Sequence, residues 1–360
     1  MADGMTSRER ILAALRLERP DRVPYLEIGV DPALAEQLLG RPAPAAGSAF
    51  SIEAQPRGVE DEKALARALN KDNIAYVLRA PVFADRAAGA DGRLFYTDGQ
   101  IRSRADLDKL VLPDPHSDDL YRGLQEFIAA KEDFALTLIT RAGFFPALLS
   151  MGMERFFLSL YDDRPFVEEV LDRYTDWSVA VTERVCSMDI DVFISTDDLA
   201  WKQGPMLSLE LFRELVMPRF RRVAAALAFV SASQGAQRAI PAAASAAAPV
   251  KKPWVMHSDG NIVPLIPDLL SLGINALHAL EPEALDIREV KRRWGNRVCL
   301  IGNVSLVTLG RGSAAQVEAE AAGLIRDLGP SGGYILSSSN SLTSYVPVEN
   351  ALALAGTPRT

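Results

Sequence analysis

The strongest constraint on the fold is a regular alternation of short apolar runs and helix-length segments along the chain. The segments between most of the runs carry apolar residues at three- and four-residue spacing, as helices packed on one face do. Strands that alternate with helices form parallel βα units, and eight such units predict an α/β fold closed as a (β/α)8 TIM barrel. The predicted strands are 23–30, 73–81, 134–143, 191–200, 252–260, 274–282, 297–305 and 333–341.

A doubly wound open sheet is the competing architecture. The glycine pattern GxGxxG, which marks its dinucleotide-binding form, does not follow the first run. We therefore expect one barrel domain over residues 1–360, beginning with a helix over 6–17 that Thr6 and Glu9 cap. Residues 83–103 predict a hairpin with turns at Asp91-Gly92 and Asp98-Gly99. The alanine-rich stretch 231–250 is interpreted as a mobile low-complexity insertion, with a distorted helix as the alternative.

Bulk composition excludes several classes of function. The formal net charge is −8, which leaves no basic excess for binding a phosphate backbone, so no nucleic-acid partner is expected. The two cysteines, Cys186 and Cys299, are too few for a disulfide framework, and a reducing cytoplasm is the expected compartment. No apolar run reaches the roughly 18–20 residues of a membrane span, so no membrane partner is expected either.

Polar side chains stand at the carboxyl end of every predicted strand. In a barrel these ends meet at one mouth, where active sites form. We therefore expect the polar ends to build one site, although alternation allows only one of the adjacent Asp197 and Asp198 to face it readily. The ends carry Glu27, Arg79, Arg141, Asp197 with Asp198, His257 with Asp259, Glu281, Asn303, and Ser338 with Asn340.

His257 is the most informative of the three histidines. Asp259 lies two residues later, on the same side of a strand, and Glu281 ends the next strand. An imidazole with two carboxylates suits a divalent metal, and without metal the same group suits acid–base chemistry near neutral pH. The alternative is a hydrogen-bonded histidine that caps a strand end. His116 is expected to be solvated in a polar loop, and His278 to be a core histidine.

Several stretches together resemble one known family, the uroporphyrinogen decarboxylase superfamily. They are TSRERILAALRLERPDRVP, DGQIRSRADLDKLVLPDP, DDLAWKQGPMLSLELFRELVMPRFRRV, KPWVMHSDGN, GNV and GYILSSSNSLTSYVPVENALAL. The resemblance covers nearly the whole chain outside 231–250 and implies a (β/α)8 barrel. The superfamily contains porphyrinogen decarboxylases and cobalamin-linked methyltransferases.

The resemblance favours the methyltransferase branch. The decarboxylases carry arginines after the first strand and an aspartate after the second, where this chain reads VPYLEIGVDPAL and VLRAPVF. The thiol-using methyltransferases place His-x-Cys, a glutamate and a second cysteine around zinc. This chain keeps His257 and Glu281 but has Asp259 at the first cysteine and 337–340 at the second. Oxygen ligands in place of sulfur imply a substrate with an oxygen- or nitrogen-bound methyl group.

The resemblance thus implies an enzyme that moves this methyl group to a corrinoid protein. The catalytic residues expected are His257, Asp197, Asp198 and Glu27, and the substrate-binding residues are Arg79, Arg141, Asn303, Ser338 and Asn340. His257, Asp259 and Glu281 are the expected ligands of Zn²⁺ or another divalent metal, and a site without metal stays open. A porphyrinogen-type decarboxylase and a non-catalytic barrel subunit are the alternatives. The partners expected are a small-molecule substrate, a corrinoid protein and, as a further option, a second copy in a homodimer.

Overall fold

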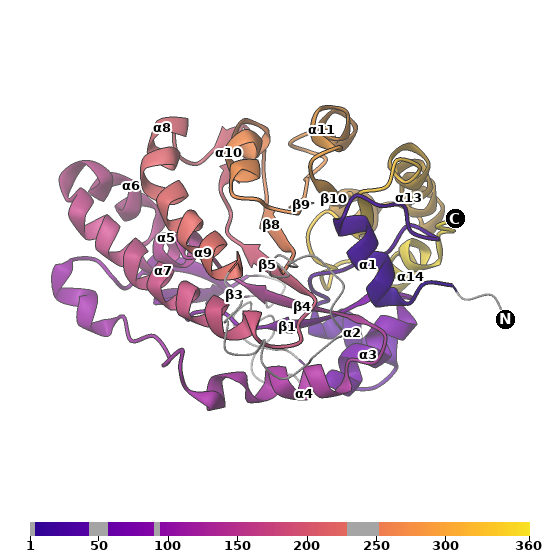
Figure 1. Cartoon of the computed structure of the whole chain (residues 1–360), viewed down its shortest axis with the longest axis horizontal. Helices are drawn as coiled ribbons and strands as arrows, with labels where there is room; N and C mark the ends of the chain where they lie inside the picture. Colours follow the sequence, from indigo (N-terminus) through magenta and orange to yellow (C-terminus); the bar gives the residue numbers. More distant parts are fainter. Residues whose placement is uncertain (1–3, 43–56, 90–93, 229–251) are drawn as a thin grey trace, which may run out of the picture.

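The structure, a computed structural model, describes residues 4–42, 57–89, 94–228 and 252–360. Within these residues, seven strands form one sheet in the order β1-β4-β5-β8-β9-β10-β11, and all neighbouring pairs are parallel. Figure 1 shows the strands inside the molecule with helices around them. The strands are Asn73–Val77 (β1), Ala135–Thr140 (β4), Val192–Thr196 (β5), Trp254–Ser258 (β8), Ala276–Ala279 (β9), Cys299–Val304 (β10) and Tyr334–Ser338 (β11).

The first predicted strand, 23–30, is extended but is not a regular strand. A parallel bridge joins Tyr25 to Leu336 of β11. On the other side, the amide of Asp72, just before β1, donates to the carbonyl of Tyr25 over 2.7 Å. The amide of Glu27 donates instead to the side-chain oxygen of Asn73, over 3.2 Å. The expectation of eight regular strands is therefore corrected to seven strands and an extended segment, among the residues described.

The helices form the outer layer (Figure 1), and apolar spacing in the sequence predicts about half of them. The capping box of Thr6 and Glu9 starts the first helix as expected, one residue later than predicted. The helices are Ser7–Leu15 (α1), Pro32–Leu39 (α2), Val59–Ala68 (α3), Arg122–Ala130 (α4), Phe144–Met151 (α5), Met153–Asp162 (α6), Arg164–Cys186 (α7), Leu209–Leu211 (α8), Met217–Ala228 (α9), Ile266–Ser271 (α10), Ile287–Trp294 (α11), Leu306–Arg311 (α12), Ala314–Leu328 (α13) and Val348–Gly356 (α14).

Two layers of apolar side chains result from the alternation along each strand. A large cluster lies between the sheet and the helices. A smaller cluster lies on the opposite face, and every strand of the sheet contributes to it, together with Leu26, Ile28 and α1. Helix α1 contacts β1, β4 and β11, which include both edges of the sheet order, so the sheet is curled. This curl brings the carboxyl ends of the strands toward one another.

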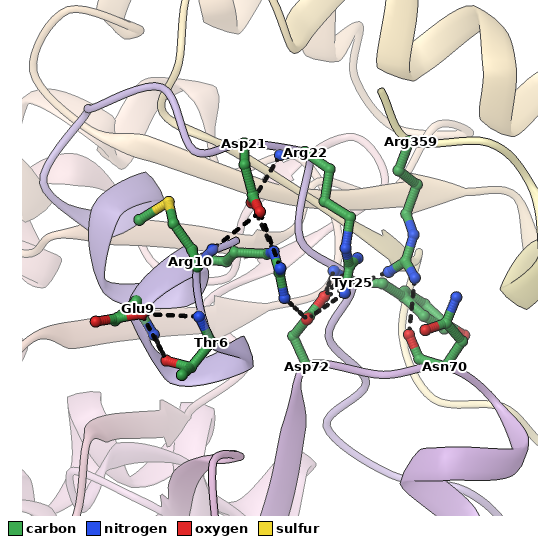
Figure 2. A network of polar contacts seen from close by, with 10 residues as sticks. Thr6, Glu9, Arg10, Asp21, Arg22, Tyr25, Asn70, Asp72 and Arg359 are labelled. Atoms are coloured by element: carbon green, nitrogen blue, oxygen red, sulfur yellow. Dashed lines mark hydrogen bonds and ion pairs between the residues drawn. The ribbon is translucent and has the colours of Figure 1, made fainter. Parts of the chain in front are cut away.

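A dense ionic network lies at the opposite, amino end of the sheet (Figure 2). Its centre is Asp72, whose carboxylate is fully buried and accepts two hydrogen bonds from Arg22, at 2.6 and 3.0 Å. The amide of Tyr25 donates over 2.9 Å, and Arg359 approaches to 3.3 Å. Arg10, from α1, lies 3.5 Å away. The network joins the segments at both ends of the described chain to the start of β1.

Three further expectations concern segments outside the main sheet. The predicted hairpin is present as Ala84–Ala88 (β2) and Leu94–Gly99 (β3). Asp98-Gly99, however, lies inside β3 and is not a turn, while Asp91-Gly92 and the stretch 231–250 lie outside the described residues. A second small hairpin pairs Ala200–Trp201 (β6) with Gly204–Pro205 (β7). In the part of the chain that is described, no helix has both the length and the apolar character that crossing a membrane requires.

Candidate active site

A cavity of about 270 Å³ lies where the strands end. Its apolar wall comes from the inner face of the sheet, and its polar groups come from the residues that follow the strands. The site therefore forms where polar strand ends predict it. Its main polar lining residues are Glu27, Arg79, Arg141, Asp198, His257, Asp259 and Asn340, and its main apolar ones are Ile28, Val30, Ala75, Val77, Ile139 and Phe145.

A histidine and two aspartates form the most concentrated group of possible ligand atoms. His257 is the penultimate residue of β8, Asp259 follows the strand, and Asp198 follows β5. The Nε2 atom of His257 lies 3.8 Å from an oxygen of Asp198 and 3.7 Å from one of Asp259. The amide of Asp259 donates to Asp198 over 3.1 Å, and the side-chain nitrogen of Asn340 donates to both oxygens of Asp259. These bonds fix both carboxylates beside the imidazole.

The other side of the His257 ring is held by a second histidine. Nδ1 of His257 lies 2.7 Å from Nδ1 of His278 in β9, and Nε2 of His278 lies 3.4 Å from the hydroxyl of Ser337. One of the two Nδ1 atoms must carry the hydrogen. Burial, with Arg79 as a second cause, lowers the pKa of His257 to about 3, so its ring is neutral. If Nδ1 of His257 donates, its Nε2 presents a lone pair to the two aspartates.

This group fits a divalent metal. Its three ligand atoms lie within 4.8 Å of one another. Neutral imidazole and carboxylate oxygens are ligands for zinc and for similar divalent ions, and a catalytic zinc site has three protein ligands. A histidine ligand commonly donates its other ring nitrogen to a neighbour, as the His278 contact allows. Burial raises the pKa of Asp198 and of Asp259, and a cation would reverse this effect.

Two arginines add positive charge to the cavity. Arg79 follows β1 and Arg141 follows β4, and both line the cavity. Burial, with the charge of Arg141 as a second cause, lowers the pKa of Arg79 to about 9. The guanidinium of Arg141 lies over the ring of Phe145, 5.5 Å from its centroid. The cavity therefore combines a cationic part with the acidic group around His257.

Glu27 is a second buried carboxyl group in the cavity. The amide and the hydroxyl of Ser338 donate to its two oxygens, over 2.8 and 2.6 Å. Burial nevertheless raises its pKa to about 7, because the hydrogen bonds from Ser338 only partly offset desolvation. A carboxyl group with this pKa exchanges a proton near neutral pH. The position of Glu27 in an extended segment, and not in a helix, lets it reach the cavity.

The structure places four of the predicted site residues differently from the expectation. Asp197 is buried outside the cavity lining and accepts hydrogen bonds from the backbone at the start of α5, so Asp198 is the member of the pair in the lining. Glu281 accepts from the amide of Gly260 and pairs with Lys202, and is not in the metal group. Asn303 donates to the carbonyl of Leu280 and lines a different hollow. Ser338 donates a hydrogen bond to Glu27 and is not among the residues that line the cavity.

Four residues near the cavity were not predicted as site residues. His278 is buried as expected, but its contact with His257 gives it a place in the site. A sequence signal was available, because two consecutive predicted strands each contain a histidine, and the structure pairs these histidines in register. The other three residues line the cavity but precede β1 in the sequence, so a search of the carboxyl ends of strands does not find them. They are Lys71, Arg57 and Glu62. Arg57 and Glu62 form a buried ion pair at 2.7 Å.

Comparisons with known proteins agree on the fold. The family model described as uroporphyrinogen decarboxylase (URO-D) matches residues 91–359. A solved methyltransferase from Methanosarcina mazei has a TM-score of 0.71 and 21% sequence identity, and covers 98% of this chain and 98% of its own. At that identity the likeness shows the fold alone. A GH10 xylanase with a bacterial Ig-like domain, from termite gut, has 10% identity, covers 79% of this chain and 65% of its own, and its TM-score of 0.37 carries no argument. No curated protein matches.

Proposed function

The chain belongs to the uroporphyrinogen decarboxylase family, because the family model matches more than half of it, and we propose that it is a methyltransferase of that family. It takes a methyl group from an oxygen or nitrogen atom of a small substrate and passes it to a corrinoid protein. The observation that carries the proposal is the group of Asp198, His257 and Asp259 on the cavity wall. The methyltransferase from Methanosarcina mazei, with the same fold, supports the same class of reaction.

The ligand chemistry favours an oxygen- or nitrogen-bound methyl group over a thiol. The three atoms around the candidate metal position are one nitrogen and two oxygens. The cysteines lie elsewhere: Cys299 is in β10 and Cys186 is in α7, and burial raises their pKa to about 12 and about 11. Neither therefore supplies a reactive thiolate. A divalent ion held by Asp198, His257 and Asp259 would act as a Lewis acid toward the leaving atom.

The residues of the chain divide the remaining tasks. When the carbon–oxygen bond breaks, the methyl carbon bonds to the reduced corrinoid, which supplies the electron pair. The substrate oxygen keeps the old bonding pair and needs a proton or a positive charge. Glu27 lines the same cavity and has a pKa of about 7, which suits a proton donor near neutral pH. His257, held by His278, presents Nε2 in a fixed direction.

Decarboxylation of a porphyrinogen fits the cavity less well. A volume of about 270 Å³ lies just below the range of ligand pockets, which commonly measure roughly 300–1,000 Å³. A tetrapyrrole with eight carboxylates needs a large and strongly basic pocket. Here the charges balance, since the lining holds four basic residues and four acidic ones. They are Arg57, Lys71, Arg79 and Arg141, against Glu27, Glu62, Asp198 and Asp259.

We also propose that the segment 24–30 completes a (β/α)8 barrel. It lies between β11 and the start of β1, and hydrogen bonds connect it to both sides. Its Leu26 and Ile28 join the inner apolar cluster with residues of every strand of the sheet. A ring closed in this way would hold Glu27 opposite the other strand ends.

Corrinoid methylation tests the function directly. Purified protein is mixed with cob(I)alamin and a panel of small methoxy and N-methyl compounds, and the visible spectrum is followed. We expect conversion to methylcob(III)alamin with at least one donor, and a loss of about 100-fold or more in His257→Ala. His116→Ala is the matched control, because His116 is exposed and is not among the residues that line the cavity. No methylation with any donor, together with release of carbon dioxide from a porphyrinogen, would reject the proposal.

A further inference from the structure

We propose that Arg141 binds an oxyanion, a carboxylate or a sulfonate, carried by the small methylated substrate. This inference deepens the proposed function, and it rests on that function for the identity of the ligand as methyl donor. Arg141 follows β4 directly, lines the cavity and is only 3% exposed. The substrate class it defines is a small organic acid with a methyl group on oxygen or nitrogen.

The first support is the unmet hydrogen-bonding capacity of Arg141. Its Nε and Nη1 atoms are buried and donate no hydrogen bond to any residue that the structure describes. A buried donor without an acceptor is rare and costly in proteins, most of all on a charged group. The ring of Phe145 covers one face of the guanidinium, but a face contact leaves the in-plane N–H groups unsatisfied. A ligand oxygen in the cavity would satisfy them.

The second support is that the neighbouring carboxylates are already engaged. Both oxygens of Asp197 accept backbone hydrogen bonds, from Ala142 at 2.5 Å and from Phe145 at 2.9 Å. Asp198 accepts from the amide of Asp259 and faces His257. Within the described chain, Arg141 forms no ion pair with a carboxylate. The counter-charge of Arg141 would therefore come from an anionic ligand.

The third support is the arrangement of the cavity as a whole. Arg79 lines the same cavity, and the repulsion between it and Arg141 is one of the causes that lower its pKa. An anion placed at the two arginines would relieve this repulsion. The apolar wall accommodates a short hydrocarbon body, and the Asp198–His257–Asp259 group lies at the same cavity. An oxyanion held at Arg141 would orient the remainder of a small molecule within reach of that group.

The test compares an acid with its neutral analogue in the absence of corrinoid. The probes are methoxyacetate and 2-methoxyacetamide, which differ mainly in charge, and binding is measured by titration calorimetry at constant ionic strength. We expect wild-type protein to bind the acid about tenfold or more tightly than the amide. In Arg141→Gln this preference should fall to about onefold. Arg292→Gln, which changes an exposed arginine paired with Glu289, should keep the wild-type preference.

Two further arms keep the test decisive. A second acid, 2-methoxyethanesulfonate, shows by its affinity relative to methoxyacetate which oxyanion the site prefers. If Arg141→Gln does not fold, judged by circular dichroism, Arg141→Lys takes its place and should show a reduced preference, because lysine keeps the charge but loses the planar donors. Equal affinity for acid and amide, binding of neither by wild type, or an unchanged preference in the folded variant would overturn the proposal.

Binding and transfer are measured separately, so their failures can be told apart. A clear preference for the acid without corrinoid methylation would reject the transferase and keep the anion site. Methylation with neutral donors and no preference for acids would keep the transferase and reject the anion site.

Discussion

The two ends of the sheet both bury charged groups, but they treat them in opposite ways. At the amino end, the carboxylate of Asp72 has donors on both oxygens, from Arg22 and Tyr25, and Arg359 lies close (Figure 2). At the carboxyl end, Arg141 has donors without acceptors, and burial shifts the pKa of several lining groups. A saturated network serves stability, whereas an unsaturated one is available to a ligand.

The largest effect that would test this comparison is expected at the amino end. Asp72→Ala should reduce the free energy of unfolding by about 3–5 kcal/mol, because it leaves the buried Arg359 without its counter-charge. Urea denaturation of both proteins measures the difference. Asp21→Ala, at the partly exposed edge of the same network, is the control and should cost about 1 kcal/mol or less. A loss of the same small size for Asp72→Ala would show that the network is not a stability element.

The next effect concerns the pH dependence that Glu27 causes at the carboxyl end. Its pKa is raised from 4.5 to about 7, so the folded state binds a proton more strongly than the unfolded chain. Stability is therefore lost as pH rises from about 4.5 to about 7, and at roughly 1.4 kcal/mol per unit the loss is about 3 kcal/mol. Glu27→Gln should lack this loss. Its free energy of unfolding relative to wild type, from urea denaturation, should rise between pH 5 and pH 8, and a constant difference would contradict the raised pKa.

A smaller effect is expected at His278, which contacts His257 but does not itself line the cavity. His278→Phe keeps the ring volume but removes the hydrogen bond at Nδ1 of His257. We expect about 10- to 100-fold weaker binding of zinc, the typical effect of losing the partner of a histidine ligand. Competition with a chromophoric chelator measures the affinity. Ser337→Ala, which alters only the longer 3.4 Å contact of His278, should change it less. Unaltered affinity in His278→Phe would mean that His257 needs no such partner.

The smallest effect is expected at an exposed ion pair near the amino end. Arg16 and Glu18 lie 2.8 Å apart, and both side chains are more than half exposed. Arg16→Ala should change the free energy of unfolding by less than about 1 kcal/mol, because solvent screens the pair and both side chains lose entropy in forming it. Urea denaturation beside Asp72→Ala shows the contrast. A cost as large as that of Asp72→Ala would mean that burial does not decide the value of an ion pair in this protein.

The sequence is sufficient to predict the parallel sheet, because each strand body is apolar and most strands are followed by a helical pattern. It fails at the first strand for a local reason. Pro24 has no amide hydrogen to donate, and the side-chain amide of Asn73 takes the place of a backbone partner for both the N–H and the carbonyl of Glu27. A hydrophobic pattern does not reveal that a side chain replaces backbone hydrogen bonds between strands in this way.

The site is predictable as a place but not in its detail. Strand ends correctly locate His257, Asp259, Arg79, Arg141 and Asn340 in one cavity. The position of a residue at a strand end does not show where its side chain points. Position alone therefore does not separate the lining residues from the predicted residues that lie outside the lining, which are Asp197, Glu281, Asn303 and Ser338. Lys71 and its neighbours before β1 reach the cavity through the packing of α3, which depends on tertiary contacts that no local pattern encodes.

The amino-end network has a consequence for synthesis of the protein on the ribosome. Asp72 and Arg359 are 287 residues apart in the sequence. While the chain is being translated, Asp72 is available early, together with Arg22, but its buried arginine partner emerges only after β11 has been made. The contact that joins the carboxyl-terminal segment to the start of β1 is therefore absent for most of translation. Variants that shorten the carboxyl-terminal segment should for this reason accumulate as protease-sensitive chains, even though every strand of the sheet is present.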